Sequence, residues 1–545
     1  MSTKLSRTTA LAAACAVMMT AMCSCAEGQN DISGDYAPNS GHSNNNVIVT
    51  PDTEEYVDEA PASADECETW KPAESISPNE DYKGFIEAGF KDPKAEPLST
   101  FSVDVDTASY SNVRRMLENG NIVPEDAVRA EEFINYFDYE YPDPEAGRVF
   151  GDYVEIADCP WNPANKLMMI GIQGKRLEQK ETPPSNLVFL IDSSGSMSDY
   201  NKLPLVQSAF SMLAEKLGEN DRISIVTYAG DASTRLKGAS GKDKDAILEA
   251  LYDITASGGT NGEGGINKAY ELAEKYFIEG GNNRVILATD GDLNIGASSE
   301  DELVKLIKTK RDKGIYLSVL GFGTGNYKDD RLEAVADNGN GNYSYIDSVD
   351  EAYRVLVQEM AGTIYTIAKD VKIQVEFNPS RIKSYRLIGY DNRLMNAEDF
   401  YDNTKDAGEV GAGHSVTALY EVELAETGET YRGVQLEFAS EHETQPVEDN
   451  GRSELCKLSV TYKPVDNDKD VYESQLFGME KYNKEPSASI KLASAAAEFA
   501  MLLKDSEYKG NSSYDHVIDT VGELEENEKT VELSELAMLA ERLYR

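Results

Sequence analysis

Five oxygen-bearing side chains stand in a pattern that suits a divalent cation. They are Asp192, Ser194, Ser196, Thr260 and Asp290. Hard cations such as Mg²⁺ prefer oxygen ligands. Two carboxylates and three hydroxyls would hold such an ion while leaving it under-neutralised, with a coordination position open. These residues predict a metal site in which a ligand with an anionic group fills the open coordination position.

Apolar runs and amphipathic segments alternate over residues 182–368, and this alternation predicts how the five side chains meet. Apolar strands are expected at 186–191, 222–228, 284–289, 315–321 and 343–346, and helices at 203–217, 245–252, 265–277, 300–313, 331–337 and 349–368. Such alternation predicts a doubly wound, mainly parallel α/β sheet. Ligands of these sheets bind beyond the carboxyl ends of the strands. Asp192 and Asp290 directly follow two strands, and Thr260 stands in a Gly-rich loop before a helix.

The order D-x-S-x-S, then Thr, then T-D-G resembles the von Willebrand factor type A domain and its metal-ion-dependent adhesion site. The resemblance covers residues 182–368 and implies that Asp192, Ser194, Ser196, Thr260 and Asp290 are the metal ligands. It implies Mg²⁺ in the site, with Mn²⁺ or Ca²⁺ as alternatives, and some ligands acting through water. A partner that donates a Glu or Asp carboxylate would complete the shell.

The flanking segments resemble a family of bacterial type A domain lipoproteins that have an N-terminal extension and a C-terminal domain of unknown function. The resemblance rests on residues 101–116, 389–393, 398–400 and 406–420. We expect an N-terminal extension over 82–181, a β-rich module over 369–470 and a helical segment over 471–545. If strands from both flanks pair in a β-sandwich-like module, the α/β domain is inserted into it.

The first residues resemble a lipoprotein signal peptide. Lys4 and Arg7 precede a short apolar stretch, which is too short for a membrane span and ends in Cys-Ser-Cys. Residues 1–24 are therefore the expected signal peptide, with Cys25 as the lipidated residue and Cys23 as the alternative. Residues 25–81 are acidic and poor in apolar residues, which predicts a disordered tether. The predicted location is the cell envelope, at the outer membrane or cell surface, with lipid as the sole membrane contact.

Composition excludes several classes of function. The chain has 52 Lys and Arg against 97 Asp and Glu, a net charge of −45, so nucleic acid is not an expected partner. With 4 His and 6 Cys, a zinc scaffold is not expected. Cys159 and Cys456 either form a disulfide between the paired β segments or remain buried free thiols.

Three functions follow, in order of preference. The first is a non-enzymatic envelope protein that uses its metal to bind a protein or another anionic ligand in adhesion or interaction. The second is a scaffold or assembly factor in which the metal domain has a structural role. The third is a Mg²⁺-dependent enzyme, which would need a nucleophile or an acid/base group beside the ion. The sequence indicates no such catalytic residue.

Overall fold

The computed structural model of the 545-residue chain describes residues 80, 82–103, 106–177, 182–291, 300–324, 328–402, 405, 407–425, 453–465 and 469–545. The expected signal peptide, most of the expected tether and the lipidation candidates Cys25 and Cys23 lie outside these residues. Residues 426–452 of the expected β-rich module lie outside them as well. None of the helices in the described part of the chain combines the length and apolar composition needed to cross a bilayer.

The α/β domain is built on a sheet with the strand order β6-β5-β4-β7-β8-β9. Its strands are β4 (Ser185–Asp192), β5 (Arg222–Tyr228), β6 (Ala232–Ser240), β7 (Asn282–Thr289), β8 (Ile315–Phe322) and β9 (Tyr343–Ile346). All neighbours run parallel except β6, which is antiparallel to β5. The predicted doubly wound, mainly parallel sheet is confirmed, with an additional antiparallel edge strand, β6.

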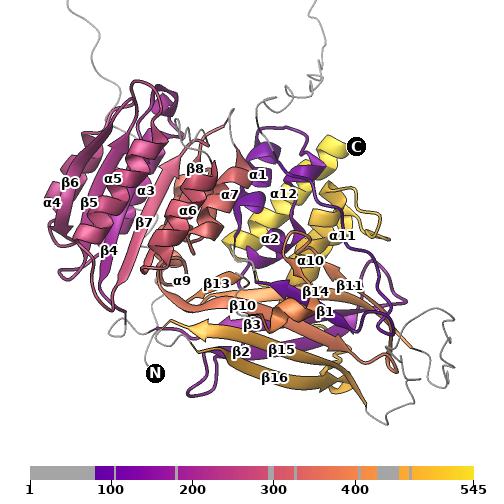
Figure 1. The fold of residues 1–545 in the computed structure, drawn as a ribbon. Helices are drawn as coiled ribbons and strands as arrows, with labels where there is room; N and C mark the ends of the chain where they lie inside the picture. Colours follow the sequence, from indigo (N-terminus) through magenta and orange to yellow (C-terminus); the bar gives the residue numbers. More distant parts are fainter. Residues whose placement is uncertain are drawn as a thin grey trace, which may run out of the picture. The chain divides into compact units, whose positions relative to one another are not determined.

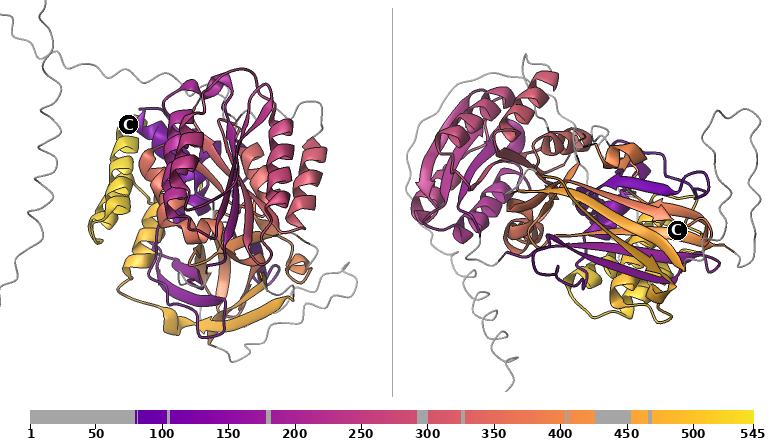
Figure 2. Two further views of the ribbon diagram at one scale, coloured as in Figure 1. Left: turned by 90° about the vertical axis from the view of Figure 1, so that its left-hand side faces the viewer. Right: turned by 60° about the horizontal axis from the view of Figure 1, so that its bottom comes forward.

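Helices cover both faces of this sheet, as Figure 2 shows in its left panel. They are α3 (Leu203–Lys216), α4 (Lys244–Tyr252), α5 (Gly262–Lys275), α6 (Glu300–Arg311) and α7 (Asp329–Asn338). Central strand β4 is buried on both faces, and its residues 187–191 form a continuous apolar run. Leu187 and Phe189 pack in the core that contains α3, and Val188 and Leu190 pack in the core that contains α5.

Two further sheets form a sandwich beside the α/β domain (Figure 1). The first has the order β12-β1-β10-β15-β16, with β13 also paired to β10, and the second has the order β11-β14-β3-β2. The strands are β1 (Leu98–Ser102), β2 (Phe150–Asp158), β3 (Lys166–Gly174), β10 (Thr366–Phe377), β11 (Ile382–Ile388), β12 (Leu394–Met395), β13 (Gly408–Gly411), β14 (Ser415–Leu424), β15 (Glu454–Pro464) and β16 (Val471–Gly478). One apolar core contains side chains from both sheets.

The α/β domain is inserted into this sandwich. β1 pairs with β10, and β3 pairs with β14, so strands that precede the domain are partners of strands that follow it. Ser99, for example, lies opposite Val375 in the sheet. The predicted insertion is therefore confirmed, and the chain enters and leaves the domain through the sandwich.

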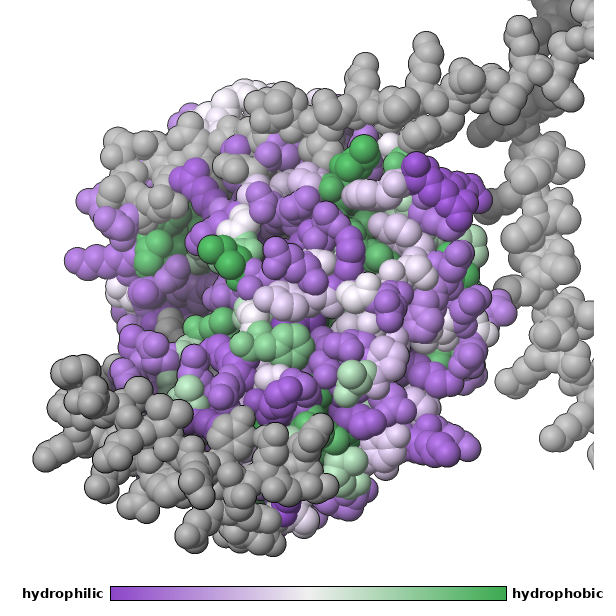
Figure 3. Space-filling model, turned by 90° about the vertical axis from the view of Figure 1, so that its right-hand side faces the viewer, coloured by the Kyte–Doolittle hydropathy of each residue, from purple (hydrophilic) through white to green (hydrophobic). Residues whose placement is uncertain are grey.

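Helices from both ends of the chain share a core with the sheet that contains β2 and β3. These are α1 (Ala108–Glu118), α2 (Ala130–Asn135), α10 (Ala488–Leu503), α11 (Tyr514–Gly522) and α12 (Glu528–Tyr544). Ile490 and Phe499 are buried, so the apolar stripe of α10 is core, as the sequence predicted. On the side seen in Figure 3, hydrophobic residues form small separate patches among hydrophilic ones.

Two sequence-based boundaries are wrong. The helix expected over 349–368 is α8 (Val349–Tyr353), a π-helical turn η4 (Arg354–Gln358) and α9 (Met360–Ile364), after which β10 begins at Thr366. The cluster of β-branched residues around Thr366 favours the strand. Residues 471–478, expected to belong to the helical segment, form the edge strand β16, whose apolar residues stand in two adjacent pairs and do not alternate with polar ones.

A buried network of ion pairs joins the α/β domain to its flanks. Arg114 of α1 pairs with Asp347 and Glu351 of the α/β domain and with Glu532 of α12, the last at 3.0 Å. Arg354 also pairs with Glu351. Burial alone would raise the pKa of Glu351, but Arg354 and Arg114 outweigh burial and lower this pKa to about 2. The network therefore depends on an ionised Glu351.

Cys159 and Cys456 are free and buried, so the disulfide alternative is wrong for this pair. Cys159 lies in the core shared by the helices and the β2–β3 sheet, whereas Cys456 lies in the core between the two sheets. The two cores pack on opposite faces of the β2–β3 sheet, which separates the thiols. Burial raises the pKa of Cys159 and Cys456 above their ordinary value.

Candidate metal centre

Asp192, Ser194 and Ser196 lie where β4 ends. Asp192 is fully buried, and its Oδ1 accepts a hydrogen bond of 2.8 Å from the backbone N–H of Ser194. The hydroxyls of Ser194 and Ser196 are 2.9 Å apart. Ser196 is exposed, so the constellation reaches from the buried end of the strand to the surface. Three of the predicted ligands thus come from a single short turn.

The loop that carries Thr260 is attached to this turn by backbone hydrogen bonds. The N–H of Gly195 donates to the oxygen of Gly258 at 3.1 Å, and the N–H of Ser257 donates to the oxygen of Ser193 at 2.8 Å. Gly258 has φ of +82°, a conformation that glycine adopts without strain. Thr260 is partly exposed and follows two residues later. The loop therefore places Thr260 at the same edge of the sheet.

Asp290 follows β7, the parallel neighbour of β4, and is 5 % exposed. Its Oδ2 accepts a hydrogen bond from the Nζ of Lys202 at 3.0 Å. Its Oδ1 is buried and has no hydrogen-bond partner in the structure. A buried carboxylate oxygen without a partner is costly, and a cation would satisfy it.

The electrostatics of the centre also suit a cation. Burial raises the pKa of Asp192 to about 6, hydrogen bonds from Ser194 oppose this rise, and the charge of Asp290 adds to it. A divalent ion bound here would offset the repulsion that the charge of Asp290 exerts on an ionised Asp192. Among the described residues, no group of three or more His, Cys, Asp or Glu side chains forms a metal site.

Sequence reasoning missed Lys202. It precedes α3, and its side chain lies at the centre because it pairs with Asp290. The signal available in the sequence was a basic residue at the start of a helix. The helix dipole favours acidic residues there, so a lysine at this position is unusual. The structure thus places four predicted ligands, and the loop of the fifth, at one edge together with an unforeseen ammonium group.

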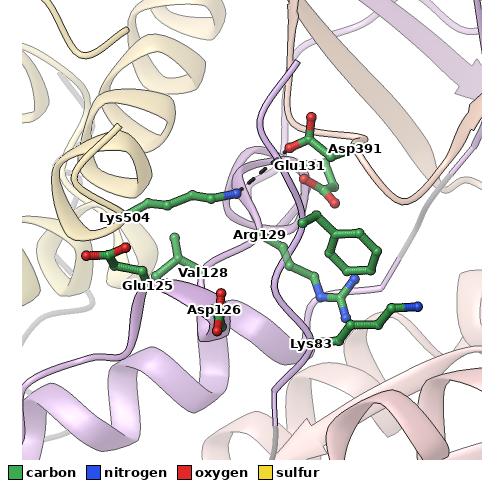
Figure 4. Close-up of a pocket in the computed structure, with 9 residues that line it drawn as sticks. Lys83, Glu125, Asp126, Val128, Arg129, Glu131, Asp391 and Lys504 are labelled. Carbon is green, nitrogen blue, oxygen red and sulfur yellow. Dashed lines mark ion pairs between the residues drawn. The ribbon is translucent and has the colours of Figure 1, made fainter. Parts of the chain in front are cut away.

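A small pocket elsewhere is no alternative site (Figure 4). It lies between the N-terminal extension and α10, and residues including Glu125, Arg129 and Asp391 line it. Lys504 pairs with Asp391 across it at 3.8 Å. Its volume of about 10 Å³ is sufficient for no more than one water molecule. We therefore assign no ligand to it.

Family models match most of the described chain. The model "von Willebrand factor type A domain" matches residues 186–359, and "Uncharacterized protein YfbK, C-terminal" matches residues 362–544. A model described as "von Willebrand factor" matches residues 76–169. The second match begins at α9 and includes the C-terminal strands of the sandwich and helices α10 to α12.

Curated relatives agree with these matches. The chain is 40% identical to "Uncharacterized protein YfbK" of Escherichia coli (strain K12) over 80% of this chain and 76% of that protein. It is 29% identical to "Inter-alpha-trypsin inhibitor heavy chain H3" of Homo sapiens over 34% of this chain and 22% of that protein. The first match extends well beyond the α/β domain.

Solved structures show more distant likeness. A "von Willebrand factor type A" protein from Catenulispora acidiphila has 14% identity and a TM-score of 0.40, and covers 74% of this chain and 91% of its own. Proximal thread matrix protein 1 from the mussel byssus, described with a zinc-occupied MIDAS motif, has 24% identity and a TM-score of 0.28. It covers 32% of this chain and 45% of its own.

Proposed function

Because the chain belongs to the YfbK family, with a von Willebrand factor type A domain and a YfbK C-terminal domain, we propose metal-dependent binding as its function. A divalent cation, Mg²⁺ in our proposal, would be held by Asp192, Ser194, Ser196, Thr260 and Asp290. It would supply a Lewis-acidic position for a carboxylate of a protein or another anionic partner at the cell envelope.

One observation carries this proposal. The turn after β4 and the end of β7 bring two buried carboxylates together with the buried hydroxyl of Ser194 and the exposed hydroxyl of Ser196, and Asp290 keeps a buried oxygen free of hydrogen bonds. Such a set can bind a cation from the protein side and leave its outer side to a ligand. We propose no catalysis, because the nearby ammonium of Lys202 is engaged by Asp290.

The test is capture of envelope proteins by the immobilised full chain. We expect retention in Mg²⁺, release by EDTA, and loss in Ser196→Ala, because an exposed ligand is removed without disturbing the core. Ser208→Ala is the matched control, since its hydroxyl donates to Pro204 within α3. Retention that survives both EDTA and Ser196→Ala would contradict metal-dependent binding.

The second candidate is a scaffold, and the buried ion pairs of Arg114 and Glu351 favour it. In that case the metal would stabilise the arrangement of the α/β domain and its flanks without an external ligand. Asp290→Ala would then increase cleavage between them in limited proteolysis. Metal-dependent capture predicts an unchanged cleavage pattern for the same variant.

We also propose that the chain is a lipoprotein of the outer membrane or cell surface, anchored at Cys25. Cells expressing the full chain should incorporate labelled palmitate into it, and Cys25→Ser should abolish the label because the acylated thiol is lost. Cys23→Ser should keep it. The reverse result would assign the anchor to Cys23. Label in both variants, or the absence of label from wild type and both variants, would refute acylation at a single cysteine.

A further inference from the structure

Lys202 and Asp290 form a buried ion pair inside the metal centre. The two side chains are 9 % and 4 % exposed, and Nζ lies 3.0 Å from Oδ2. A buried ion pair gains little net stability over apolar packing, because both charges lose their hydration. Its presence at a ligand-binding edge therefore calls for a reason other than stability.

The aliphatic part of the Lys202 side chain lies against Gly323, where no side chain fills the space. Gly323 follows β8 with φ of +72°, and a Cβ there would lie 2.3 Å from Cε of Lys202. The oxygen of Gly323 accepts a hydrogen bond of 2.6 Å from the hydroxyl of Tyr345, which fixes this backbone. The oxygen of Lys202 accepts from Val206 N–H at 2.9 Å at the start of α3. The ammonium is thus positioned by three separate elements.

The ion pair involves only one of the two carboxylate oxygens of Asp290. Oδ2 receives the ammonium, while Oδ1 is buried and free of hydrogen bonds, so a metal ion and Lys202 can share the residue. With both aspartates ionised, Asp192, Asp290 and Lys202 carry a formal charge of −1, which a divalent cation changes to +1. Without Lys202 the occupied centre would be neutral.

We propose that Lys202 is a built-in cation of the metal centre, which weakens binding of the divalent ion and strengthens binding of the anionic ligand. The inference rests on the proposed function. Like charges repel strongly in a partly desolvated site, so the lysine opposes the metal ion. Once the ion is bound, the surplus positive charge attracts a carboxylate. Lys202 is thus a specificity-determining residue for anionic partners.

The test compares wild type with Lys202→Met and Lys202→Gln in the full chain. Mn²⁺ affinity is measured by electron paramagnetic resonance, and acetate binding to the Mn²⁺-loaded protein by water-proton relaxation. Both variants should bind Mn²⁺ at least about tenfold more tightly and acetate several-fold more weakly, because one positive charge is removed. Lys202→Arg should keep wild-type behaviour. Lys268→Met, which removes a charge from the exposed face of α5, is the matched control.

The outcomes separate this inference from the proposed function. Equal Mn²⁺ affinity in wild type and folded variants, or acetate affinity that does not fall, would overturn the inference and leave the metal site intact. Mn²⁺ binding by the variants alone would support the inference and overturn the proposed function for the native chain. The absence of Mn²⁺ binding in all of them would overturn both. Near-ultraviolet circular dichroism verifies that each variant is folded.

Discussion

Asp192→Asn is expected to abolish Mn²⁺ binding and also to raise the free energy of unfolding of the metal-free protein by about 2 kcal/mol. The side chain is fully buried, and burial raises its pKa to about 6. Asparagine removes the buried charge and can still accept the hydrogen bond from Ser194 N–H. The substitution therefore relieves a cost of the fold while it removes a metal ligand.

This gain should depend on pH. An acid whose pKa is raised on folding destabilises the folded state increasingly as pH rises from its unfolded pKa to its folded pKa, and by a constant amount above that. The difference between variant and wild type should therefore be absent below about pH 4, develop up to pH 6 and stay constant above it. Urea unfolding in EDTA measures it. A variant that is less stable than wild type at pH 7, or one that retains Mn²⁺ affinity, would contradict the assigned role.

Glu351→Gln should lower the free energy of unfolding by about 3 kcal/mol, because it leaves two buried guanidinium groups short of a counter-charge. Arg114 and Arg354 both pair with this carboxylate, and together they connect α1 with the end of the α/β domain. Urea unfolding at pH 7 gives the free-energy difference. Limited proteolysis should show faster cleavage around α8.

The loss should also follow pH. Arg354 and Arg114 lower the pKa of Glu351 from 4.5 to about 2. A lowered acid pKa stabilises the fold above pH 4.5, and this stabilisation is lost as pH falls towards 2. Wild type and variant should therefore converge in acid. Glu271→Gln, at an exposed ion pair with Lys268, should stay close to wild type throughout. A Glu351→Gln deficit that persists at pH 2 would exclude the ion pairs as its cause.

The elements that the sequence predicted are those whose burial leaves a clear signal. β4 and β7 are buried along their whole length and have apolar runs at their centres, because helices cover both faces of the sheet. β6 carries polar residues on both faces, since it is an edge strand, and no alternation reveals it. The pairing of β1 with β10 joins residues far apart in sequence. Local patterning suggests that the two strands pair but does not determine their register.

At the candidate site, the predicted residues belong to strand ends, and the parallel sheet brings strand ends together. Lys202 does not follow a strand, and its position depends on the space left by Gly323 after β8. The cysteines illustrate the same limit. The predicted strand pairing places Cys159 and Cys456 in the same module. The sequence does not show on which face of a sheet each thiol lies, and the two thiols lie in different cores.

The insertion also sets an order of events during synthesis. β1 finds its partner β10 only after about 280 further residues have been made, because Leu98 lies opposite Glu376. The α/β domain closes its sheet within residues 185–346 and can fold first, since its contacts are closer in sequence. Until its neighbours β10 and β12 appear, β1 is a segment of the nascent chain without its strand partners. A chaperone that protects such segments would be needed most over this interval.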